Sequence, residues 1–187
     1  SEAVRQIINL DNLSLSKIIR LNTNITNLQD NVFFIDSVLI FEARDAGANV
    51  KLLAENGMLK LMNVRNGREL ARASLSDLTQ VILVGADDSP DFFNLFLADA
   101  YGKLESGVVI YGGNSAGDVI NVFGSTRKDT FAVGGDSIEI NGNDVSYFGI
   151  ERIRLVKRGG ADTITIDDDV LAACDDSLAR LGTDYID

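Results

Sequence analysis

The chain has 187 residues, 45% hydrophobic and 24% charged, with no His, no Trp and one Cys. A chain of this length can bury one core without disulfides or metals, and the missing His and second Cys exclude a histidine triad, an imidazole-ligated zinc site and an intramolecular disulfide. The net charge of −11 repels phosphate backbones, so nucleic acid is not an expected partner.

The sequence predicts a single β-rich domain over residues 1–187. Its Asn-rich opening, residues 1–31, is expected to form an N-terminal cap or a first irregular coil. Short runs rich in β-branched residues then predict strands. In chain order these runs cover residues 32–35, 38–41, 50–53, 58–64, 81–84, 92–97, 108–111, 119–123, 130–133, 138–140, 145–148, 153–156 and 163–166.

Asn-Gly pairs punctuate this series of strands at Asn56, Asn66 and Asn141. Such pairs favour the tight turns of antiparallel hairpins. They predict antiparallel pairing in the first half of the chain and around residues 140–145.

An internal repeat, Asp-x-apolar-x-apolar, marks residues 85–169, and glycines usually precede it. Copies at Asp91, Asp118, Asp136 and Asp162 lie 27, 18 and 26 residues apart. This spacing favours successive coils whose equivalent strands stack in parallel. The predicted fold class is therefore all-β, a parallel β-helix or β-solenoid with irregular coils, and the alternative is an antiparallel β-sandwich.

The last part of the chain changes to helical spacing, with apolar residues at Val170, Leu171, Cys174, Leu178 and Leu181. A short capping helix is expected over residues 169–182, ended by Gly182. Such a helix would cover the last coil of a solenoid.

The segments GGNSAGDVINV, from Gly112, and RGGADTITI, from Arg158, resemble haemolysin-type (RTX-like) repeats of secreted bacterial proteins. The resemblance implies a parallel β-roll with Ca²⁺ held between successive glycine-rich turns. The chain departs from that family by lacking a tandem nine-residue period. The stretch from Ile140 to Ile166 is also similar to β-solenoid segments of very large bacterial surface proteins.

Calcium is the candidate metal, because hard oxygen ligands recur at the predicted strand starts. The candidate ligands are Asn114, Asp118, Asp129, Asp136 and Asp162. The alternative role for these aspartates is to accept hydrogen bonds from turn amides, which is the common reason for Asp at such positions.

Candidate catalytic carboxylates are Asp87, Asp88 and Asp91, which form the densest acidic cluster before a predicted strand. Two basic pairs, at 127–128 and 157–158, precede repeat units, where they could pair with carboxylates or contact a sulfated glycan. No set of residues combines an acid, a base and a ring-stacking platform, so we expect a protein that is not an enzyme. A polysaccharide hydrolase or lyase is the alternative.

The expected function is therefore a non-enzymatic structural, adhesion or binding module of a secreted or surface-exposed bacterial protein, with carbohydrate or a cell-surface protein as partner. No apolar run is long enough to span a membrane. The near-absence of Cys suits export without disulfides, and the expected location is extracellular or at the cell surface.

Overall fold

A computed structural model describes residues 30–43, 47–98, 104–168 and 170. The expected N-terminal cap, except for the first two residues of the first strand, and nearly all of the expected C-terminal helix lie outside these residues. The described chain forms strands joined by turns, with one turn of 3-10 helix, η3 (Leu75–Asp77). The strands are β1 (Asp30–Ile35), β2 (Val38–Ala43), β3 (Asn49–Glu55), β4 (Met58–Asn63), β5 (Glu69–Ser74), β6 (Gln80–Val84), β7 (Phe92–Phe96), β8 (Val108–Tyr111), β9 (Val119–Phe123), β10 (Thr130–Val133), β11 (Ser137–Ile140), β12 (Asn143–Phe148), β13 (Arg152–Val156) and β14 (Thr163–Ile166).

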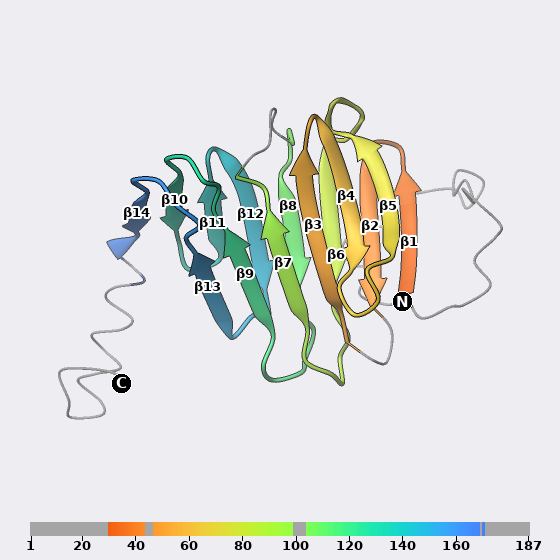
Figure 1. Cartoon of the computed structure of the whole chain (residues 1–187). Helices are drawn as coiled ribbons and strands as arrows, with labels where there is room; N and C mark the ends of the chain where they lie inside the picture. Colours follow the sequence, from red (N-terminus) through yellow and green to blue (C-terminus); the bar gives the residue numbers. More distant parts are fainter. Residues whose placement is uncertain (1–29, 44–46, 99–103, 169, 171–187) are drawn as a thin grey trace, which may run out of the picture.

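The strands make two mixed sheets that lie face to face, as Figure 1 shows. We call the eight-stranded sheet, in the order β1-β2-β6-β8-β12-β11-β10-β14, sheet A, and the six-stranded sheet, β13-β9-β7-β3-β4-β5, sheet B. The predicted all-β class is confirmed. Every run predicted as a strand lies within a strand or overlaps one, whereas β5 was not predicted.

Most parallel pairs join two strands of one sheet between which the chain passes through the other sheet. In sheet A, β2, β6, β8 and β12 pair in parallel, and in sheet B β3, β7, β9 and β13 do the same. The chain passes from sheet A to sheet B four times in the same way, from β2 to β3, β6 to β7, β8 to β9 and β12 to β13. The sheet-A strands therefore all end at the edge where the sheet-B strands begin.

Antiparallel strands extend both sheets. β4 and β5 continue sheet B beyond β3, and β11 and β10 continue sheet A beyond β12. The predicted antiparallel pairs at Asn56, Asn66 and Asn141 are confirmed, since these Asn-Gly pairs lie in the connections from β3 to β4, β4 to β5 and β11 to β12. Asn56 and Gly57 have φ of 52° and 74°, which the tight turn between twisted strands requires.

The core lies between the two sheets and is filled by alternate side chains of each strand. Phe41 and Leu83 from sheet A face Leu52, Phe93 and Ile120 from sheet B, and each of these side chains is 0% exposed. This alternation leaves the other side chains on the two outer faces. A smaller apolar cluster, formed by three sheet-A residues, is separate from the main core: Ile40, Ile82 and Val84.

Candidate functional site

The carboxylates of the repeat gather at the turns, where strands of one sheet pass to the other. Asp91 precedes β7 and Asp118 precedes β9, and both side chains are 0% exposed. Because Phe92 pairs with Val119 and Val119 with Arg152, the residues before these strands fall in one row across sheet B. That row contains Ala48, Asp91, Asp118 and Glu151.

Each carboxylate in this row accepts a hydrogen bond from the backbone of the neighbouring coil. The Ala48 N–H donates to Asp91 Oδ1, the Asp91 N–H donates to Asp118 Oδ1 at 2.8 Å, and the Asp118 N–H donates to Glu151 Oε2 at 2.7 Å. We call this row, formed by Asp91, Asp118 and Glu151, the first carboxylate ladder. Its three bonds join four parallel strands, β3, β7, β9 and β13, at the points where these strands enter sheet B.

Bonds within each turn complete the ladder. Asp91 Oδ2 accepts from the Ala86 N–H at 2.9 Å, and Asp118 Oδ1 accepts from the Ser115 hydroxyl at 3.0 Å. The remaining oxygen, Asp118 Oδ2, is buried and has no hydrogen-bond partner. Three of the four carboxylate oxygens of Asp91 and Asp118 therefore accept hydrogen bonds.

Burial is the largest influence on the pKa values of the two aspartates in this ladder. It raises the pKa of Asp91 to about 7, against the opposing effect of the amide bonds from Ala48 and Ala86, and the nearby Asp118 raises it further. Burial also raises the pKa of Asp118, opposed by its bonds to the Asp91 N–H and to Ser115, while Glu151 acts in the same direction as burial. The two carboxylates thus hold protons to higher pH than exposed aspartates do.

Glycine at position 112 makes the close stacking of these turns possible. A Cβ atom there would lie 2.0 Å from the Gly149 carbonyl oxygen and 2.8 Å from Asp118 Oδ2. Both contacts are shorter than any real Cβ contact, so a side chain would push neighbouring turns apart. The glycine at position 112, which precedes this copy of the Asp repeat, is therefore needed because a larger residue does not fit between the turns.

A second carboxylate ladder, formed by Asp129 and Asp162, lies at the opposite edge of the sheets, where β10 and β14 begin. The Asp129 N–H donates to Asp162 Oδ1 at 3.1 Å. Asp129 itself accepts from the Ser125 N–H at 2.6 Å and from Asn141 Nδ2 at 2.8 Å. Asp162 Oδ2, like Asp118 Oδ2, is buried without a partner.

The two ladders correct the predicted stacking of the repeat. Asp91 and Asp118 do precede neighbouring strands, as their 27-residue step indicated, but Asp162 aligns with Asp129 and not with Asp118. Asp136 is exposed in the turn between β10 and β11. The prediction of one series was wrong, because strands beginning at opposite edges of the sheets carry the same sequence pattern.

The five predicted calcium ligands therefore fall into separate places. Asn114 and Asp118 share one turn, where Asn114 Nδ2 donates to Asp87 Oδ1 at 3.1 Å, while Asp129 and Asp162 share the opposite edge. In the part of the chain that the structure describes, no three acidic or cysteine side chains are grouped so that they could hold a metal ion. The structure does bring together two carboxylates at each edge.

The three predicted catalytic carboxylates differ in exposure. Asp87 and Asp88 are exposed in the turn after β6, whereas Asp91 is buried and accepts two backbone amides. Asp91 therefore belongs to the ladder and not to the exposed acidic pair. Sequence reasoning missed Glu151 as a ladder member, since the apolar repeat that follows Asp elsewhere is replaced by Arg-Ile-Arg-Leu.

Comparisons of the chain with protein-family models, with curated proteins and with solved structures give no match. Among the described residues, no helix has the length and apolar character needed to cross a membrane.

Proposed function

We propose that this chain is a non-enzymatic structural and binding module, built as a β-solenoid, in a secreted or surface-exposed bacterial protein. The observation that carries the proposal is the use of the repeat carboxylates. Asp91, Asp118 and Asp129 all accept backbone amides, and all three of their own N–H groups donate to the next carboxylate. These side chains hold neighbouring coils together, and because they are buried they do not meet a substrate at the surface.

The solenoid architecture is favoured over a sandwich by the order of the parallel strands. Four passages from sheet A to sheet B place each new strand beside its predecessor, so neighbours in space are successive turns of the chain. A sandwich built from hairpins and Greek keys would instead pair these strands antiparallel. The hairpins β4-β5 and β10-β11 then count as insertions that lengthen individual coils.

An extracellular or cell-surface location, with carbohydrate or a surface protein as partner, agrees with a stacked scaffold of this kind, because solenoids present long, rigid faces for binding. Calcium remains a candidate ligand, and the two buried oxygens without partners, on Asp118 and Asp162, are the atoms at which it would act. Our proposal is that these aspartates hold amides and that the fold forms without the ion.

One experiment tests the structural and catalytic alternatives together. The purified chain is melted in calcium and in sodium at matched ionic strength, and is incubated with neutral and acidic polysaccharides while reducing ends and unsaturated products are followed. We expect equal melting temperatures in the two salts and no turnover. Turnover that disappears in Asp87→Asn or Asp88→Asn would contradict the proposal and favour the polysaccharide-processing alternative. A calcium-specific rise would contradict the metal-free assignment.

The solenoid itself is tested by nuclear magnetic resonance. Parallel pairing of Asn94 with Asn121, and of Ile153 with Ile120, predicts nuclear Overhauser contacts between their strands. Antiparallel contacts between β7 and β9 would refute the architecture, independently of any binding result.

A further inference from the structure

Part of the outer face of sheet B differs in charge from the chain as a whole. The outward positions of β7, β9 and β13 carry no carboxylate. They are occupied by Phe92, Asn94, Phe96, Val119, Asn121, Phe123, Arg152, Arg154 and Val156. Lys51 on the neighbouring β3 and Arg158 just after β13 add two more cations. A chain with a net charge of −11 thus presents one locally cationic surface.

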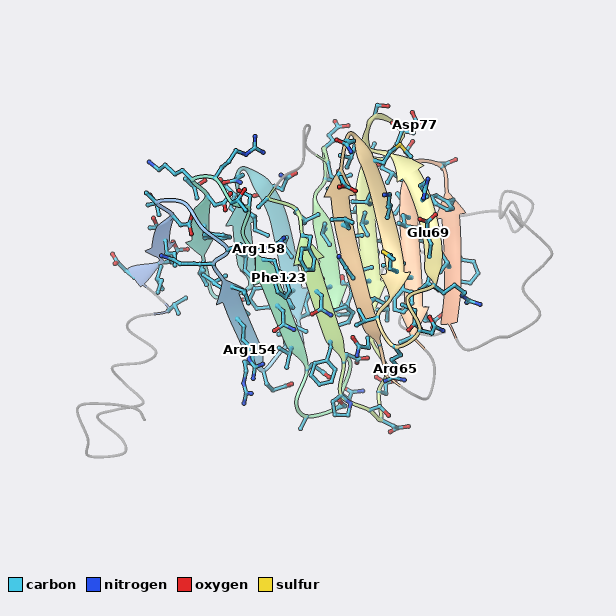
Figure 2. The ribbon with its side chains drawn as sticks, in the orientation of Figure 1. Arg65, Glu69, Asp77, Phe123, Arg154 and Arg158 are labelled. Carbon is cyan, nitrogen blue, oxygen red and sulfur yellow. The ribbon has the colours of Figure 1, made fainter. Side chains whose placement is uncertain are left out.

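We call this surface, formed by Lys51, Phe96, Phe123, Arg152, Arg154 and Arg158, the basic-aromatic face. Figure 2 shows Phe123, Arg154 and Arg158 on the same part of sheet B, away from Glu69 and Arg65. In sheet B, β13 and β5 form opposite edges, which places the basic-aromatic face at one end of the sheet.

The polar groups of this face lie in a regular row. Lys51 pairs with Asn94, Asn94 with Asn121 and Asn121 with Arg154, so one residue from each of four parallel strands lies side by side. Neighbouring strands are about 4.8 Å apart, so the row is about 14 Å long. Asn121 Nδ2 donates to Asn94 Oδ1 at 3.1 Å, which fixes the two amides and leaves Asn121 Oδ1 as an acceptor.

The aromatic rings make a second row beside the first. Phe96 and Phe123 stack with ring centroids 4.1 Å apart and planes 6° apart. Lys51 Nζ lies 4.3 Å from the Phe96 centroid, and the Arg158 guanidinium carbon lies 5.8 Å from it. Because rings on neighbouring strands stack face to face, they turn their edges to solvent, and a ring edge carries partial positive charge.

Most cations of this face are not neutralised by carboxylates. Elsewhere on sheet B, Lys60 pairs with Glu55 at 3.4 Å and Arg72 with Glu69 at 2.7 Å. Arg152, Arg154 and Arg158 are exposed, and none of them forms a salt bridge with a carboxylate of the described residues. Exposed guanidinium groups present fixed pairs of donors that match carboxylate and sulfate oxygens.

We infer that the basic-aromatic face binds an acidic polysaccharide, one that carries carboxylate or sulfate groups; this inference rests on the proposed role as a binding module. The guanidinium groups hold the acid groups, Asn121 Oδ1 accepts from a sugar hydroxyl, and the electropositive ring edges contact oxygen atoms of the sugar. The regular spacing of the strands suits a linear polymer with repeated acid groups.

The contacts that the face offers favour this ligand over other polyanions. Single-stranded nucleic acids bind aromatic surfaces by stacking their bases on ring faces, but Phe123 and the Lys51 ammonium already occupy the faces of the Phe96 ring. An acidic peptide would satisfy the cations, but it offers Asn121 Oδ1 at most one backbone N–H per residue. A sugar polymer with spaced acid groups carries several hydroxyl donors on each ring beside those acid groups.

The test uses calorimetry with heparin as the sulfated probe, polygalacturonate as the carboxylated probe and dextran as the neutral control. Arg154→Gln and Arg158→Gln should each weaken binding of an acidic probe by about fivefold, which corresponds to about 1 kcal/mol. The matched control is Arg72→Gln, which removes the same charge from the same sheet at the opposite edge, where Glu69 neutralises it. This variant should bind like the native chain.

The possible results separate the inference from the proposed function. Equal loss in Arg72→Gln and Arg154→Gln, no binding of either acidic probe, or equal binding of dextran would overturn the basic-aromatic face as an acidic-polysaccharide site. Tighter binding of poly-glutamate or of an oligonucleotide would overturn polysaccharide as the ligand. None of these results bears on turnover or on strand pairing, which decide the proposed function.

Discussion

Asp118 offers the sharpest test of the carboxylate ladder, because its two oxygens have different surroundings. Oδ1 accepts from the Asp91 N–H and the Ser115 hydroxyl, whereas Oδ2 is buried without a partner. An asparagine can place its amide oxygen at the Oδ1 position and keep both bonds. Alanine removes both. The two replacements therefore separate the hydrogen bonds of this side chain from its charge.

The expected magnitudes follow from these contacts. Asp118→Ala leaves the buried Asp91 N–H without its acceptor, which costs about 1–3 kcal/mol. For a chain of this length, 2 kcal/mol lowers the melting temperature by about 4–8 °C. Asp118→Asn keeps the acceptor and removes a buried charge beside Asp91 and Glu151, so at neutral pH it should be neutral or stabilising by about 1 kcal/mol.

Urea denaturation followed by circular dichroism, at several pH values, measures both effects. Burial raises the folded-state pKa of Asp118, so the native chain loses stability relative to Asp118→Asn as pH rises above the unfolded-state pKa of about 4. Below that pH the two should converge. If Asp118→Asn is as destabilising as Asp118→Ala, the carboxylate charge itself is required. A bound cation would then become the better account of this turn.

Three other perturbations have clear expected outcomes. Gly112→Ala should lower the free energy of unfolding by more than about 2 kcal/mol, because it forces stacked turns apart. At Gly135 an added Cβ meets nothing within 4 Å, so Gly135→Ala should change stability by less than about 0.5 kcal/mol in the same urea denaturation assay. Because the pKa of Asp91 is raised from 3.8 to about 7, protonated Asp91 stabilises the fold below pH 4, and this contribution, at most about 4 kcal/mol, is lost as pH rises to about 7. A stability profile that keeps the same slope in Asp91→Asn would refute that origin. Ile120→Ala, at a side chain that is 0% exposed, should cost about 2–5 kcal/mol, and Ile164→Ala, at a 40% exposed one, less than about 1 kcal/mol, as measured by thermal melting.

The strands could be predicted well because their sequence pattern is local. Alternation of β-branched residues identified the strands on both sides of the core, and Asn-Gly pairs identified three of the antiparallel connections. β5 was missed because its sequence, ELARAS, contains residues that favour helices. It becomes a strand through pairing with β4, for example Leu61 with Ala71, which is tertiary information.

The stacking of the coils could be predicted only in part. The step from Asp91 to Asp118 contains no insertion, so its 27 residues identified a true neighbour. The step from Val119 to Arg152 contains the β10-β11 hairpin, and the row there ends in Glu151 in place of Asp. The sequence pointed to the basic-aromatic face only through the basic pair at 157–158, because its cations come from two separate segments, Lys51 on β3 and residues 152–158, that the sheet brings together.

Ionic strength should affect binding at the basic-aromatic face in an unusual way. The whole chain carries a charge of −11, which repels an acidic polymer, while the face presents four local cations, Lys51, Arg152, Arg154 and Arg158. At 0.01 M salt the screening length is about 30 Å, so the polymer responds to the total charge, and at 0.15 M it is about 8 Å, so the local cations dominate. Near 1 M even these contacts are screened. Affinity for heparin should therefore pass through a maximum at intermediate salt, whereas a uniformly basic protein would bind best at the lowest. A steady fall of affinity from 0.01 M upward would mean that the acidic turns lie too far from the bound polymer to repel it.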